Sequence, residues 1–84
     1  MSHIICDFRP FDMNQGIMVY VNGECVKSLS VGINQVTNVV NTLKNQYNIN
    51  QIDLYGNESY LSKFKANMLN KFEDSDCEIN IIQR

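Results

Sequence analysis

The dipeptide Asn22-Gly23 is the sequence feature that most constrains the fold. It lies between two segments rich in apolar and β-branched residues, Ile17–Val21 and 24–31. Both central residues of a type I′ turn need a positive φ angle, which Asn and Gly adopt readily, and this turn joins two twisted antiparallel strands well. The sequence therefore predicts a β-hairpin, and counting outward from the turn places Val19 opposite Val26.

The rest of the chain divides into helices and strands by the spacing of its apolar residues. A spacing of three or four predicts helices over about 34–47 and 58–72, and Asn57 is a suitable N-cap for the second. Alternating or short apolar runs predict further strands at 3–8, 51–55 and 77–82. The expected buried stripes are Ile33, Val36, Val40, Leu43 and Tyr47 in the first helix, and Leu61, Phe64, Met68, Leu69 and Phe72 in the second.

This order of elements predicts a single α/β domain spanning residues 1–84. Sequential strands are usually neighbours, and parallel crossovers through a helix are right-handed. The simplest solution is one five-stranded mixed sheet in the order 3-2-1-4-5, in which only the second strand is antiparallel. Both crossovers then run in the same direction across the sheet, so both helices should cover the same face.

The opposite face of the predicted sheet has no helix to cover it. Alternation places these residues there: His3, Ile5, Asp7, Asp53, Tyr55, Glu78, Asn80 and Ile82. The hairpin is apolar on both sides, with Ile17, Val19, Val21 and Val26 against Met18, Tyr20, Cys25 and Leu29. Only one set can lie under the helices, and the other is expected to meet a partner. The candidate interaction residues are Ile17, Val19, Tyr20, Val21, Val26 and Tyr55.

Composition and charge narrow the classes of partner. The net charge is −2 and the basic residues form no stripe, which disfavours nucleic acid. The apolar runs are too short to span a membrane, and the N-terminus lacks the features of a signal peptide, so we expect a cytoplasmic protein. Cys6, Cys25 and Cys77 form no CxxC pair and are expected to be buried and reduced. No cofactor or metal is implied, since zinc would need partners beyond the single histidine, His3.

Two short stretches carry a family resemblance. The segment Ile4-Ile5-Cys6-Asp7-Phe8 with the hairpin after it, and the segment Ile52-Asp53-Leu54-Tyr55-Gly56-Asn57 with the following helix, resemble the ribonuclease H-like fold and its actin-like ATPase branch. The resemblance implies a site at Asp7 and Gly56. The catalytic and phosphate-binding motifs are missing, however. The helix over 34–47 has no carboxylate, Pro10 stands near the expected glycine turn, and Asn57 replaces a glycine.

These observations predict a non-enzymatic protein-interaction domain that forms a homodimer or binds a protein partner through the open sheet face or the hairpin. Frequent asparagine and nearly absent alanine are typical of AT-rich coding sequences, and they suggest a phage or mobile-element accessory or inhibitor protein. The alternative is a remnant nuclease or nucleotide-binding domain, in which Asp7 and Asp12 hold a metal and Gly56-Asn57 binds an anion. Asp7 is otherwise expected to cap a turn or to pair with Arg9. Tyr55, His3 and Asp53 would support proton transfer only if they converge.

Overall fold

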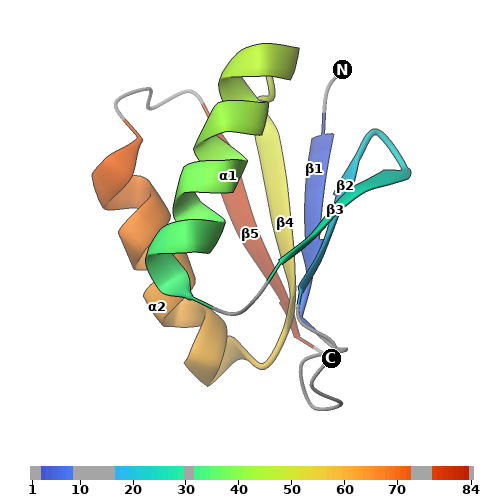
Figure 1. Ribbon diagram of the computed structural model, residues 1–84. Helices are drawn as coiled ribbons and strands as arrows, with labels where there is room; N and C mark the ends of the chain where they lie inside the picture. Colours follow the sequence, from blue (N-terminus) through green and yellow to red (C-terminus); the bar gives the residue numbers. More distant parts are fainter. Residues whose placement is uncertain (1–2, 9–16, 30–31, 73–76, 84) are drawn as a thin grey trace.

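The computed structural model describes residues 3–8, 17–29, 32–72 and 77–83. Its elements follow the predicted order (Figure 1): β1 His3–Asp7, β2 Ile17–Val21, β3 Glu24–Leu29, α1 Ile33–Tyr47, β4 Gln51–Gly56, α2 Glu58–Lys71 and β5 Glu78–Gln83. The five strands form one sheet in the order β3-β2-β1-β4-β5. β1 pairs antiparallel with β2 and parallel with β4, and β4 pairs parallel with β5. The predicted mixed sheet and its strand order are confirmed.

The turn between β2 and β3 has the predicted backbone. Asn22 and Gly23 have φ angles of 51° and 91°, so both adopt the positive φ that a type I′ turn requires. The Asn22 side chain also fixes the turn to the sheet, because its Oδ1 accepts a hydrogen bond of 3.0 Å from the backbone N–H of His3. The turn therefore ties the hairpin to the start of the central strand.

The predicted pairing of Val19 with Val26 is wrong. Tyr20 pairs with Cys25, but Val19 pairs with Lys27, so the register shifts by one residue and Val26 is the additional residue on β3. This is the pattern of a β-bulge, in which two residues of one strand oppose one residue of the other. Counting pairs outward from the turn fails beyond Cys25, because Val26 has no partner on β2 and every later pair is shifted by one residue. The side chain of Leu29 and residues 30 and 31 lie outside the described part of the chain.

Both helices cover the same face of the sheet, as Figure 1 shows. The core between them consists mainly of Ile4, Cys6, Phe8, Ile17, Val19, Val21, Val36, Val40, Ile49, Ile52, Leu54, Leu61, Phe64, Met68, Phe72, Cys77 and Ile79. Each helix is also capped at one end by an asparagine. Asn57 Oδ1 accepts from the N–H of Tyr60 at the start of α2, and Asn48 ends α1 in the left-handed conformation with φ 55°.

Two residues of the expected helix stripes are exposed instead. Tyr47 is exposed in the last turn of α1, and Leu69 is 55% exposed on α2, one position beyond the buried Met68. Successive helical residues differ by about 100° in direction, so Leu69 points well away from the buried row. On α1 the buried face instead includes Thr37 and Lys44. The Lys44 side chain lies over Phe72, with Nζ 5.6 Å from the ring centroid, so its stem is covered while its charge meets an aromatic face.

Candidate interaction surface

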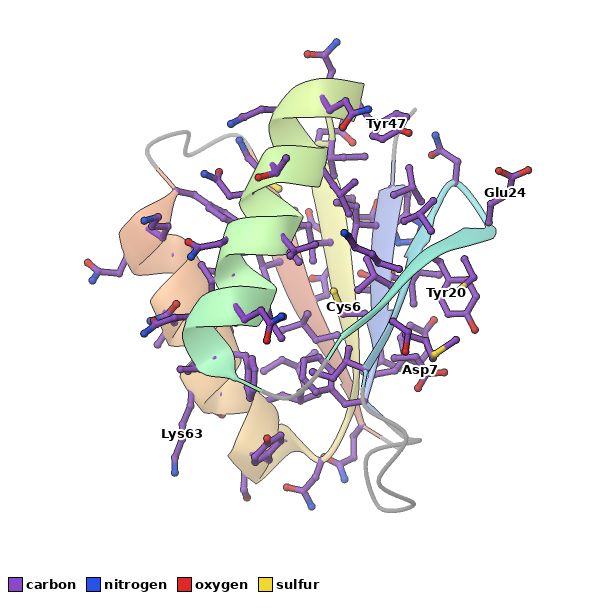
Figure 2. All side chains as sticks on the ribbon, in the orientation of Figure 1. Cys6, Asp7, Tyr20, Glu24, Tyr47 and Lys63 are labelled. Carbon is purple, nitrogen blue, oxygen red and sulfur yellow. The ribbon has the colours of Figure 1, made fainter. Side chains whose placement is uncertain are left out.

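The strand register determines which side chains lie next to one another on the sheet face away from the helices. Residues opposite one another on neighbouring strands share a face. One such row runs Tyr20, Ile5, Asp53 and Asn80 across β2, β1, β4 and β5, and the next runs Met18, Asp7, Tyr55 and Ile82. Figure 2 shows Tyr20 and Asp7 directed away from the helices and Cys6 directed toward them. The face therefore brings together polar side chains from β1, β4 and β5.

The Asp53 cluster, which comprises His3, Gln51, Asp53, Glu78 and Asn80, is the main polar feature of this face. Asp53 is only 7% exposed. His3 Nε2 lies 2.8 Å from Asp53 Oδ2, and Asn80 Nδ2 donates to Asp53 Oδ1 at 3.1 Å. Gln51 Nε2 adds a longer contact of 3.5 Å to Oδ1, and Asn80 also donates to Glu78 Oε2 at 2.8 Å. A carboxylate so deeply covered needs such donors, and the cluster supplies them from three strands.

This geometry places two of the three residues weighed for proton transfer in direct contact. His3 and Asp53 form a pair, and this pair is part of a side-chain hydrogen-bond network on the sheet face. Tyr55 lies in the next row, opposite Asp7 and Ile82. In the described arrangement, His3 and Asp53 therefore stabilise each other, which gives both side chains a structural role.

Of the two carboxylates predicted as possible metal ligands, Asp7 and Asp12, only Asp7 lies within the described residues. Asp7 is buried at the end of β1, but Asp12 and Arg9 lie outside the described residues. Within the described ranges, no group of three His, Cys, Asp or Glu side chains is placed to hold a metal ion. The pairing of Asp7 with Asp12 stays a prediction.

The strand–helix junction at Gly56 and Asn57 is occupied by contacts within the chain. Gly56 has φ 153°, which other residues rarely adopt, and a Cβ atom there would lie 3.1 Å from Cβ of Phe8, so both the backbone and the packing favour glycine. The N–H of Glu58 donates to Gln83 Oε1 at 2.7 Å, and Asn57 caps the N–H of Tyr60. Two of the donors that an anion would use at this helix end are therefore already engaged.

The hairpin separates its two apolar sets. Ile17, Val19 and Val21 are buried beneath the helices, so of the candidate interaction residues only Tyr20, Val26 and Tyr55 remain accessible. Val26 is 39% exposed. It does not lie with the buried valines of β2 as expected, because the bulge places Lys27 instead of Val26 opposite Val19. Sequence reasoning had no signal for this change, since no residue type marks the bulge.

The strand β3 is an edge of the sheet. Every residue described from Glu24 to Ser28 is exposed. The expectation that all three cysteines are buried is wrong for Cys25, which lies on this edge, whereas Cys6 and Cys77 are buried. Burial raises the pKa of the Cys6 thiol to about 12. The Cys25 thiol, in contrast, is exposed and can be reached by reagents in solution.

No helix in the described part of the chain is long and apolar enough to cross a membrane. Comparison of the chain with protein-family models, with curated proteins and with solved structures finds no match.

Proposed function

We propose that the chain is a non-enzymatic protein-interaction domain that binds a protein partner along the β3 edge of its hairpin. The observation that carries the proposal is the exposure of β3 from Glu24 to Ser28 at the end of the sheet. An edge strand presents backbone N–H and C=O groups that another strand can pair with. This mode of recognition draws affinity from the main chain and selectivity from the neighbouring side chains.

The side chains beside this edge suit a protein partner. Val26 is exposed on β3, and Tyr20 is half-buried on the adjoining strand, on the side away from the helices. An aromatic ring and an aliphatic side chain beside a free edge supply apolar area at an interface. The Asp53 cluster and the engaged donors at α2 make internal contacts, which favours binding over chemistry as the role of this sheet.

The experiment compares two variants with the same chemical change. Val26→Glu places a charge on the edge at a position without a β2 partner, and Leu69→Glu places the same charge on exposed α2 surface. Tagged wild type and both variants are used for quantitative pull-down from the organism that encodes the chain, and for sedimentation of the purified protein. Circular dichroism verifies that each variant is folded.

We expect wild type and Leu69→Glu to share an association, either with another protein or with a second copy, that Val26→Glu loses. Equal association of all three proteins would contradict the use of this edge. A rise in melting temperature with Mg²⁺ or a nucleotide would instead favour the metal or nucleotide site at Asp7 and Gly56, because a ligand that binds the native state stabilises it.

A further inference from the structure

The bulge in β3 has a consequence for charge. In a regular strand, residues three positions apart point to opposite faces. Glu24 pairs with Val21 and Lys27 pairs with Val19, and both valines lie on the buried, helix-covered face. Glu24 and Lys27 therefore share one side of β3, although they are three positions apart. This edge carries one negative and one positive charge on the same side.

Such a pair of charges is complementary to itself under two-fold symmetry. When a strand pairs antiparallel with its own copy about a two-fold axis, residue i faces residue j and residue j faces residue i. In the register that places Glu24 of one copy opposite Lys27 of the other, the same contact occurs twice. Each copy has two residues between these contacts, Cys25 and Val26. Cys25 of one copy then faces Val26 of the other.

We propose that β3 pairs antiparallel with β3 of a second copy, with Glu24 of each copy opposite Lys27 of the other. The inference rests on the proposed function and names its partner. The sheet then continues across the interface, and both helical layers lie on the same side. The single lysine in β3 disfavours pairing with strands that carry positive charge at that position, whereas the second copy offers a glutamate there. The contact is short, so the dimer belongs among small interfaces of modest affinity.

The exposed thiol of Cys25 reports on this register. Cys25 of one copy lies diagonally across from Cys25 of the other, and strand spacing and rise place their Cα atoms about 6 Å apart. That separation is within the range that a disulfide bridges. Diamide accepts the two electrons and two protons released when the two thiols join. The covalent dimer should therefore form in wild type and not in Cys25→Ser.

The decisive experiment is a charge exchange followed by sedimentation equilibrium at protein concentrations up to the millimolar range. Glu24→Lys and Lys27→Glu each turn two attractive contacts per dimer into two repulsive ones, and we expect dimerisation to weaken roughly tenfold or more. The double variant restores opposite charges across the axis and should regain wild-type dimerisation. Lys63→Glu makes the same charge change on exposed α2 surface and should leave the dimer unchanged.

The outcomes separate this inference from the proposed function. A strict monomer, or a double variant that stays dissociated, overturns pairing with a second copy. If the chain is monomeric but captures another protein that Val26→Glu loses, the edge is an interaction site for a different partner and only the second-copy inference fails. If a dimer forms that none of the charge variants affects, a different surface holds it and the inference is again overturned.

Discussion

Replacing the buried threonine of α1 by valine should stabilise the protein. Thr37 is 1% exposed, and its Oγ1 has no hydrogen-bond partner among the described residues. An unsatisfied buried hydroxyl costs about 1–3 kcal/mol, and the methyl group that replaces it gains about 0.8 kcal/mol from burial. Threonine and valine have similar helix propensities, so this contribution cancels. We expect Thr37→Val to raise the free energy of unfolding by roughly 2–4 kcal/mol.

Urea denaturation measures this change, and the same helix offers a matched control. Thr42 is exposed, and its Oγ1 donates to the carbonyl of Asn38 at 3.0 Å, so Thr42→Val should change stability by less than about 0.5 kcal/mol. Each kilocalorie gained at Thr37 should raise the melting temperature by about 4–8 °C. A Thr37→Val protein that is less stable than wild type would refute the reasoning, because its hydroxyl would then make a hydrogen bond worth more than its burial costs.

Three further predictions concern the core. Phe64→Ala should lower the free energy of unfolding by about 3–5 kcal/mol, because Phe64 is buried and its ring centroid lies 4.8 Å from that of Phe8. A loss below about 1 kcal/mol in urea denaturation would show that the Phe64 ring does not pack in the core. Gly56→Ala should cost about 1–3 kcal/mol in thermal melts because of its φ of 153° and the approach to Phe8. Gly32→Ala should cost less, because its new Cβ would come no closer than 3.7 Å to another atom and only the N-cap preference of α1 would be affected; equal effects would contradict this. Burial raises the pKa of the Cys6 thiol from 9.0 to about 12, so the unfolded state loses its proton first as the pH rises. The free energy of unfolding of wild type minus that of Cys6→Val should therefore be constant below pH 9 and fall between pH 9 and 12, by up to about 1.4 kcal/mol per pH unit. A difference that stays constant across that range would rule this out.

The features that the sequence predicts correctly are those set by local chemistry and by simple alternation. Asn22-Gly23 specifies its turn because few other residue pairs tolerate two positive φ angles. The alternation of Ile4, Cys6 and Phe8 with His3, Ile5 and Asp7 locates the buried face of β1, where all three apolar side chains lie in the core. The strand order then follows from short connections and right-handed crossovers.

The errors arise where tertiary packing decides. The bulge at Val26 has no residue signature, and it changes which hairpin residues face the helices. The spacing of apolar residues on α1 does not identify Lys44, which is buried because its long stem packs while its amine meets the Phe72 ring. The Asp53 cluster depends on the register between β1, β4 and β5, which no local pattern reports.

The central position of β1 has a consequence for the order of folding. The β1–β2–β3 meander is built from contacts between consecutive strands, whereas the parallel pair joins His3 to Gln51 across all of β2, β3 and α1. Closing that long loop loses chain entropy before its contacts compensate, so the β1–β4 pair should limit the folding rate. Core substitutions at Ile4 or Ile52, which lie in this pair, should therefore slow refolding in stopped-flow measurements. Since β3 lies at the end of the sheet and its residues from Glu24 to Ser28 are exposed, this edge should be the part of the sheet that opens and recloses most freely in the folded protein.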